Sequence, residues 1–291
     1  MPPLYYAMGQ EQPGSVGFPA AWIPAEMNTD HVQGFIVHRF VGLSMHAIGV
    51  DIGGSGVRIA RVNTQTGEMV TEPTLLHHTP STSAPAILDA LSSELRRFPN
   101  DLPVGIGFPG VVQRCVVETA PNLGSTWPGI DLSLALGHSQ LSVINDADAA
   151  AVAEHRWGAS NEVTGTVLTV TVGTGLGTAL HRHGVLVPNL ELGILPHPTH
   201  GGRLEDRASG RAKSNHSLSL KQWANRFQEV LQLYEMWLNP DLIVVGGGIT
   251  DQWEAWAPMI CTRAEVRKAR FGRYAGLIGA ALITAVDDEA S

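Results

Sequence analysis

The sequence contains little charge, few cysteines and few aromatic residues. Only 16% of its 291 residues are charged, whereas 44% are hydrophobic, which argues against a disordered chain. The 27 acidic residues outnumber the 19 basic ones. This balance excludes a general binder of nucleic acid or of anionic membranes, although it leaves room for a local basic patch.

Cysteine is scarce and long apolar runs are missing. Cys115 and Cys261 stand alone without a CxxC spacing, which excludes a disulfide framework and a cysteine-rich zinc module. The longest apolar stretch, residues 275–286, is too short to span a bilayer. No basic segment followed by an apolar core marks a secretory signal at the beginning of the sequence. We therefore expect a cytoplasmic protein without a membrane or nucleic-acid partner.

Residues 1–44 differ from the rest of the chain. They hold five prolines and show no sustained period, and a clear strand pattern begins directly after Met45. An ordered arm is one interpretation. The other is an extension outside the core fold, with an upstream start codon and Met45 opening the domain proper. We favour the extension.

From residue 46 onward, strand and helix patterns alternate, which predicts an α/β protein. Val- and Ile-rich runs bounded by Gly or Pro predict strands at 47–51, 57–62, 103–108, 112–118, 141–145, 165–172, 177–181 and 241–246. Helical patterns occupy 84–98, 147–157, 220–238, 252–268 and 276–286. The clearest is 220–238, which Ser219 precedes as a predicted N-cap and Pro240 follows.

Two glycine-rich turns repeat one design. Residues 51–56 read Asp-Ile-Gly-Gly-Ser-Gly, and residues 171–178 read Thr-Val-Gly-Thr-Gly-Leu-Gly-Thr. Strand-like residues follow both, so they predict β-hairpins rather than the strand-to-helix turn of a Rossmann or Walker site. Ordinary tight hairpins would satisfy the pattern. We favour a duplicated fold whose turns bind phosphate through backbone N–H groups. The residues proposed to bind phosphate or nucleotide are Asp51, Gly53, Gly54, Ser55, Gly56, Thr171, Gly173, Thr174 and Gly175.

A carboxylate follows a predicted buried strand at residues 145–150, Asn-Asp-Ala-Asp-Ala-Ala. The ends of strands in α/β sheets are where ligand chemistry occurs. Asp146 there could accept a hydroxyl proton during phosphoryl transfer. The alternative is that Asn145 or Asp146 is simply the N-cap of the next helix.

Further segments suit a sugar or an anion, each with an ordinary alternative. Residues 107–110 (Gly-Phe-Pro-Gly), with Asn122 and Trp127 after them, could present amides to hydroxyls and an indole to a ring face. Glu191 could bind two adjacent hydroxyls, or be a surface carboxylate. The glycines Gly246, Gly247 and Gly248 could border a nucleotide, or form a loop that needs unusual backbone angles.

Six basic residues lie between Arg203 and Arg226. Such a run is usually a solvated helical face. A track for an extended polyanion, formed by Arg207, Arg211 and Lys213, is the alternative.

Together these motifs resemble the ROK (repressor, open reading frame, kinase) family of sugar kinases in the actin-like ATPase superfamily, and in particular the members that use inorganic polyphosphate. The resemblance runs from about residue 46 to 285 and rests on DIGGSG (51–56), GFPGVV (107–112), NDADAA (145–150), TVGTGLGTAL (171–180), VLVPNLELG (185–193) and PDLIVVGGGI (240–249). It implies an α/β fold of the actin-like (ribonuclease H-like) type, duplicated, with a central cleft. The implied domains are residues 45–146 plus 276–291 and residues 147–275.

The resemblance also implies an activity: phosphorylation of the 6-hydroxyl of glucose, with mannose as a second candidate, by polyphosphate and ATP with Mg²⁺. Asp146 would be the base. Asp51, at the end of the first predicted strand, could hold Mg²⁺ through water, or be a solvated or capping carboxylate. The sugar would contact Asn122, Asn145, Glu191, Gly107, Pro109 and Gly110, and Gly246–Gly248 would border adenosine. A homodimer is expected. A strictly ATP-dependent ROK hexokinase is the alternative, and a ROK-type sugar-sensing regulator is a further one, which the Pro-broken residues 1–44 disfavour.

Departures from the family pattern concern the sugar site and a metal. Family members often read Glu-x-Gly-His, but Ile194 stands at the fourth position here, which puts sugar selectivity in doubt. Arg58 replaces a Lys that these kinases often carry. The chain has no cysteine between 116 and 260, so we predict no structural zinc; His197 and His200 alone are too few ligands.

Overall fold

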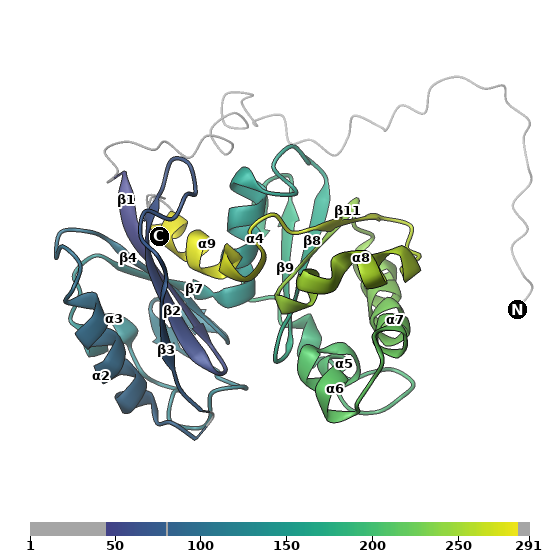
Figure 1. Ribbon diagram of the computed structural model, residues 1–291, viewed down its shortest axis with the longest axis horizontal. Coiled ribbons are helices and arrows are strands. Elements are labelled where there is room, and N and C mark those ends of the chain that lie inside the picture. The colour runs from purple at the N-terminus through teal and green to yellow at the C-terminus, as the bar shows by residue number, and fades with distance from the viewer. Residues whose placement is uncertain (1–44, 80, 285–291) are drawn as a thin grey trace, which may run out of the picture. The chain divides into compact units, whose positions relative to one another are not determined.

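The computed structural model describes residues 45–79 and 81–284 (Figure 1). The predicted extension at 1–44 and the last residues of the helix predicted at 276–286 lie outside the described residues. Two five-stranded sheets form the framework of the described chain, and helices cover them. No helix in the described part is both long and apolar enough to cross a bilayer.

The first sheet has the strand order β3-β2-β1-β4-β7. Its strands are β1 (His46–Gly53), β2 (Gly56–Asn63), β3 (Thr74–His77), β4 (Val104–Phe108) and β7 (Leu141–Asn145). The first three are antiparallel neighbours, whereas β1, β4 and β7 run parallel. Helix α2 (Ala84–Leu95) buries Ile87, Leu88 and Leu91 in the core on one face. The short helix α3 (Leu132–Leu136) contributes Leu132 to the same core.

The second sheet repeats this plan with the order β10-β9-β8-β11-β12. Its strands are β8 (Thr166–Val172), β9 (Leu176–Arg182), β10 (Val185–Val187), β11 (Leu242–Gly246) and β12 (Glu265–Lys268). Helix α7 (Leu220–Leu238) packs its apolar stripe on this sheet, and Ser219 and Gln222 form a capping box at its beginning. Shorter helices surround it: α5 (Leu204–Ala208), α6 (Gly210–Asn215) and α8 (Trp253–Trp256).

Helices α4 (Asp146–Trp157) and α9 (Ala275–Ile283) pack against each other and against the first sheet. Small residues permit this approach. A Cβ on Gly105 of β4 would collide with the Ala280 carbonyl, and a Cβ on Gly279 would collide with that of Ala149. The packing brings the beginnings of α4 and α9 together: Asp146 and Gly276 line the same pocket.

Most predicted elements are confirmed, and one is wrong. Residues 252–268 do not form a single helix. They contain α8, a 3₁₀ turn η4 (Ala257–Met259) and strand β12. Pro258 lies in that turn, and β12 pairs in parallel with β11 from Glu265 onward. The strand predicted at 112–118 is divided into β5 (Val112–Gln113) and β6 (Val116–Val117), because Arg114 and Cys115 take positive φ angles at a turn.

Candidate active site

Residues from most of the sequence motifs line one pocket of about 250 Å³. Its lining comes from both sheets and from the beginnings of α4 and α9. The predicted residues that line it are Asp51, Gly53, Gly54, Ser55, Pro109, Asn122, Asp146, Thr171, Gly173, Thr174, Gly175, Glu191, Gly247 and Gly248. The predicted residues that are not part of the lining are Gly56, Gly107, Gly110, Asn145, Gly246, Arg207, Arg211 and Lys213.

Both glycine turns are β-hairpins, as predicted. Gly53 pairs with Gly56 between β1 and β2, and Val172 pairs with Leu176 between β8 and β9. The two turns face each other, because a Cβ on Gly54 would lie 3.5 Å from Oγ1 of Thr174. Backbone N–H groups from two facing hairpins can surround a phosphate chain, which side chains at these positions would obstruct.

Asp146 is the first residue of α4, and Asn145 is the N-cap. Oδ1 of Asn145 accepts hydrogen bonds from the backbone N–H groups of Ala147 (2.9 Å) and Asp148 (3.1 Å). The carboxylate of Asp146 is therefore not needed for capping and lines the pocket. Burial, followed by repulsion from Asp51 and Glu191, holds the pKa of Asp146 well above its usual range.

Glu191 lines the pocket, and Asn145 lies behind it as its hydrogen-bond partner. Nδ2 of the 3%-exposed Asn145 donates to Oε1 of Glu191 at 2.7 Å and to the Gly110 carbonyl at 3.1 Å. Burial raises the pKa of Glu191, and the Asn145 hydrogen bond opposes that rise. Asn145 thus orients a carboxylate whose other oxygen has no hydrogen-bond partner among the described residues.

Glu205 also lines the pocket, and the sequence reasoning missed it. It lies in α5 and is 2% exposed. Arg203 approaches its Oε1 at 3.5 Å and Arg211 at 3.8 Å. Arg211 also donates to Oδ1 of Asn122 at 3.2 Å. No local motif marks Glu205; only the tertiary arrangement places it opposite Glu191.

Trp127 does not belong to the site. It is fully buried, lies edge-on to Phe108 at 5.1 Å between ring centroids, and is absent from the pocket lining. The expectation that its indole covers a sugar ring is therefore wrong. Ile194 does line the pocket, at the position where the family pattern carries His.

The residues proposed as a polyanion track have other partners. Arg207 donates from Nε and Nη2 to Oε2 of Glu229 in α7, at 3.0 and 2.8 Å. Arg211 contacts Asn122 and Glu205, as described above. Lys213 lies in the last turn of α6 and is partly exposed. Of the three, Lys213 alone has no ion pair or side-chain hydrogen bond among the described residues.

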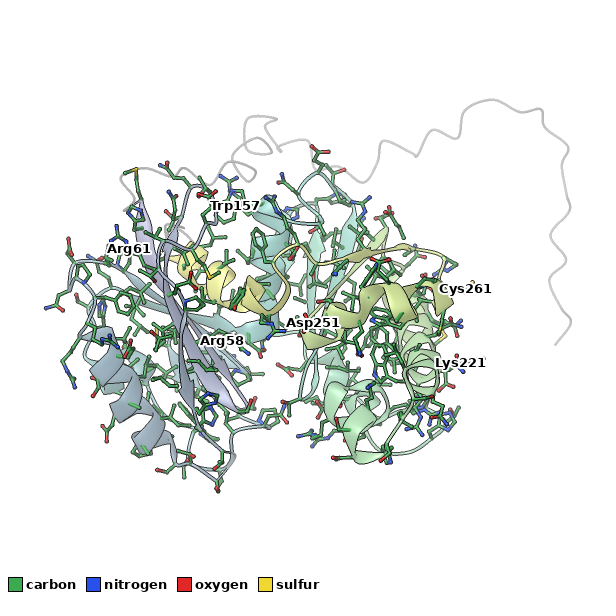
Figure 2. The ribbon with its side chains drawn as sticks, viewed as in Figure 1. Arg58, Arg61, Trp157, Lys221, Asp251 and Cys261 are labelled. Atoms are coloured by element: carbon green, nitrogen blue, oxygen red, sulfur yellow. The ribbon has the colours of Figure 1, made fainter. Side chains whose placement is uncertain are left out.

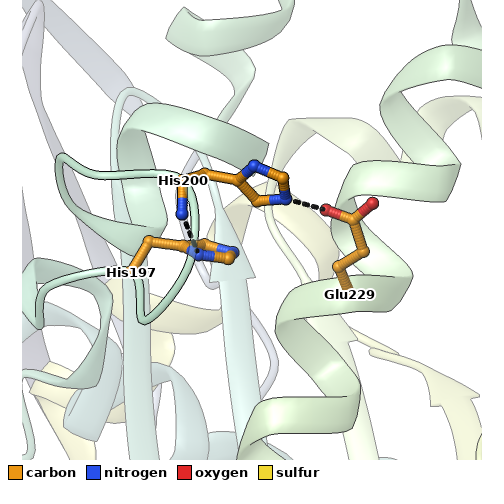
Figure 3. A group of neighbouring side chains, drawn as sticks. All are labelled: His197, His200 and Glu229. Atoms are coloured by element: carbon orange, nitrogen blue, oxygen red, sulfur yellow. Dashed lines mark hydrogen bonds and ion pairs between the residues drawn. The ribbon is translucent and has the colours of Figure 1, made fainter.

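His197, His200 and Glu229 form a separate group whose ligand atoms lie within 4.8 Å of one another (Figure 3). Nδ1 of His197 accepts from the backbone N–H groups of Thr199 and His200, at 3.3 Å each. A neutral ring that accepts at Nδ1 carries its proton on Nε2, so it offers no lone pair there to a cation. The carboxylate of Glu229 is already paired with the guanidinium group of Arg207. Glu229 of α7 thus links to His200 and Arg207, and this arrangement favours a contact between the loop and α7 over a metal centre.

Comparison with known proteins shows the family of this chain. A model of the ROK family matches residues 47–187. Polyphosphate glucokinase of Mycobacterium tuberculosis is 35% identical over 247 residues, which cover 83% of this chain and 92% of that protein. Inorganic polyphosphate/ATP-glucomannokinase from an Arthrobacter strain is similar in structure, with a TM-score of 0.77 at 35% identity over 83% of this chain and 99% of that one.

A ROK family glucokinase from Streptomyces griseus, solved with glucose and AMPPNP, has a TM-score of 0.68 at 24% identity, over 82% of this chain and 98% of that one. At that identity the likeness concerns the fold alone. The expected actin-like α/β fold is confirmed by these relatives. The chain has paired glycine hairpins, and it matches a 35%-identical relative over 92% of that relative's length. It therefore belongs to the ROK family.

Proposed function

We propose that this protein phosphorylates the 6-hydroxyl of glucose, with inorganic polyphosphate and also ATP as donors. The observation that carries the proposal is the pocket itself: two facing glycine hairpins and the carboxylate of Asp146 line one space. The 35%-identical relatives that are named polyphosphate glucokinase and polyphosphate/ATP-glucomannokinase support this choice of donor and sugar.

Asp146 would act as the general base. Phosphoryl transfer depends mainly on positioning and on charge stabilisation, so the base has only to remove one hydroxyl proton as the new bond forms. The raised pKa of Asp146 makes its carboxylate a stronger proton acceptor than an ordinary aspartate. The same shift reduces the ionised fraction, so activity should fall on the acid side at a higher pH than an unperturbed aspartate would give.

The sugar would be held by Asn122, Glu191 and Glu205. Asn145 would orient Glu191 rather than contact the sugar, because both of its amide hydrogens and both lone pairs of its oxygen are already used within the protein. The two glutamates can accept hydrogen bonds from adjacent hydroxyls, while amides can donate or accept. Pro109 lines the pocket, and Gly110 receives the Asn145 amide, so the turn at 107–110 would shape this side rather than bind through side chains.

The hairpins at 53–56 and 173–175 would hold the donor phosphates, and Gly246–Gly248 would border the adenosine of ATP. Asp51 fits a role in holding Mg²⁺: it lines the pocket, is 9% exposed, and gives one carboxylate beside the phosphate positions. Mg²⁺ is commonly held by one or two carboxylates together with substrate phosphates. When bound, the ion would neutralise charge on the transferring phosphoryl group. Arg58 donates to Oδ2 of Asp51 at 3.1 Å and would hold this carboxylate in place.

A two-by-two assay tests the proposal. Glucose and mannose are each offered with ATP and with a long polyphosphate, with Mg²⁺. Glucose 6-phosphate is measured by a coupled dehydrogenase, and mannose 6-phosphate by the same dehydrogenase after isomerases have converted it to glucose 6-phosphate. We expect turnover of glucose with both donors. Turnover with ATP alone would replace the proposal by a strictly ATP-dependent hexokinase, and no turnover with either donor would refute a kinase. Size-exclusion chromatography of the same sample tests the proposed homodimer.

A further inference from the structure

The pocket has an uneven charge distribution. Among the described residues, its lining contains the carboxylates of Asp51, Asp146, Glu191 and Glu205 but only two cationic groups, the guanidinium groups of Arg58 and Arg273. Arg58 is bound to Asp51. Of these two arginines, Arg273 is therefore the one that is not paired with a carboxylate of the pocket.

Arg273 is bound outside the pocket instead. It lies in the 3₁₀ turn η5 (Gly272–Tyr274), directly before α9, and its Nη2 pairs with Oδ2 of Asp251. Asp251 lies in the neighbouring turn η3 (Gly248–Gln252), which follows Gly247. Figure 2 labels Asp251 and Arg58, which flank the region between the two sheets in that view. The pair thus joins η3 to η5 beside the glycines proposed to border adenosine.

This ion pair can be exchanged at little cost. The side chains of Arg273 and Asp251 are 52% and 58% exposed, and exposed ion pairs contribute little to stability. Asp251 is not part of the pocket lining, whereas Arg273 is. An anion that enters the pocket can therefore compete with Asp251 for the guanidinium group, and an arginine binds phosphate oxygens through two parallel hydrogen bonds.

The two proposed donors differ in what they present here. The negative charge of ATP lies on three phosphates, which are followed by the uncharged adenosine. A long polyphosphate continues as a chain with a negative charge on every unit, and it needs a cation beyond the glycine hairpins. We propose that Arg273 is this cation: it releases Asp251 and binds the distal phosphates of a long polyphosphate where the chain leaves the pocket between η3 and η5. The inference rests on the proposed function, because it concerns the donor of the same reaction.

Four proteins test it: the unchanged chain, Arg273→Gln, Asp251→Asn and the double variant. KM is measured for long polyphosphate, tripolyphosphate and ATP at saturating glucose. We expect Arg273→Gln to raise KM for long polyphosphate about 5- to 10-fold, with less than about 2-fold change for ATP and tripolyphosphate. Asp251→Asn should lower KM for long polyphosphate about 2- to 3-fold, because it removes the competitor. In the double variant, the effect of Asp251→Asn should vanish.

Lys221→Gln is the matched control, because it removes one exposed positive charge from the beginning of α7, outside the pocket lining (Figure 2). It should leave all three KM values unchanged. An unchanged polyphosphate KM in Arg273→Gln would overturn the inference, as would equal increases for all three donors. The unchanged chain is measured first, before any variant is compared. If it uses ATP but not polyphosphate, the proposed donor is wrong.

Discussion

Replacing Asp146 with Asn separates the two roles that its sequence position allows. A base must accept a proton, and an amide cannot. A helix cap must accept N–H groups, but the structure assigns this task to Asn145. Asp146→Asn keeps the size and shape of the side chain, so it removes the proton acceptor without removing the cap.

Asp146→Asn is expected to lower kcat but not to lower the stability. General-base catalysis contributes about 10²- to 10⁴-fold, so kcat should fall at least ~100-fold, or about 2.7 kcal/mol of barrier. Stability should stay equal or rise at neutral pH. The folded-state pKa of Asp146 lies above its unfolded value, so ionisation of this carboxylate costs stability as the pH increases, and the neutral amide removes that cost.

The assay combines steady-state kinetics for glucose with urea denaturation at pH 7. Asn145→Ala serves as the contrasting variant, because it loses two capping hydrogen bonds and should lose about 0.5–2 kcal/mol of stability. The glucose dissociation constant of Asp146→Asn should change little. If Asp146→Asn keeps near-full kcat, or loses stability as Asn145→Ala does, the assignment of Asp146 as the base is refuted.

Three further predictions concern separate parts of the chain. Burial lowers the pKa of His181 from 6.5 to about 4, so His181 binds more protons in the unfolded chain between these values and its contribution to the unfolding free energy drops by about 2 kcal/mol from pH 7 to pH 5; the difference in unfolding free energy between the unchanged chain and His181→Phe, measured by urea titration at both pH values, should change by this amount. Ile194→His should lower KM for glucose about 2- to 10-fold by supplying a hydroxyl partner, and an unchanged KM would show that the ring does not reach the sugar. Lys213→Gln should leave KM for long polyphosphate and for ATP unchanged, because the chain is proposed to leave the pocket between η3 and η5; a salt-sensitive increase for long polyphosphate alone would show that it follows the basic run instead.

Sequence patterns predicted the elements whose signal is local. Helix α7 was predicted at its observed bounds, since its apolar period and its Ser219 cap lie within one segment. The failure at 252–268 has the opposite cause. Residues 265–268 form a strand because β11 offers a parallel partner, which the segment's own helical pattern does not reveal. Pairing between distant segments decided this element, and propensity did not.

The same distinction holds in the pocket. The hairpins around Gly54 and Thr174 and the helix start at Asp146 are contiguous motifs, and each could be recognised in the sequence because one short segment carries the whole geometry. Glu205 and Arg273 lie in segments without a motif, and they reach the pocket because α5 packs on α7 and because η5 precedes α9. A contiguous motif carries its geometry within one segment, whereas residues such as Glu205 and Arg273 enter the pocket from segments that only the tertiary fold brings there. The structure around the motifs is therefore needed to find the groups that complete the pocket.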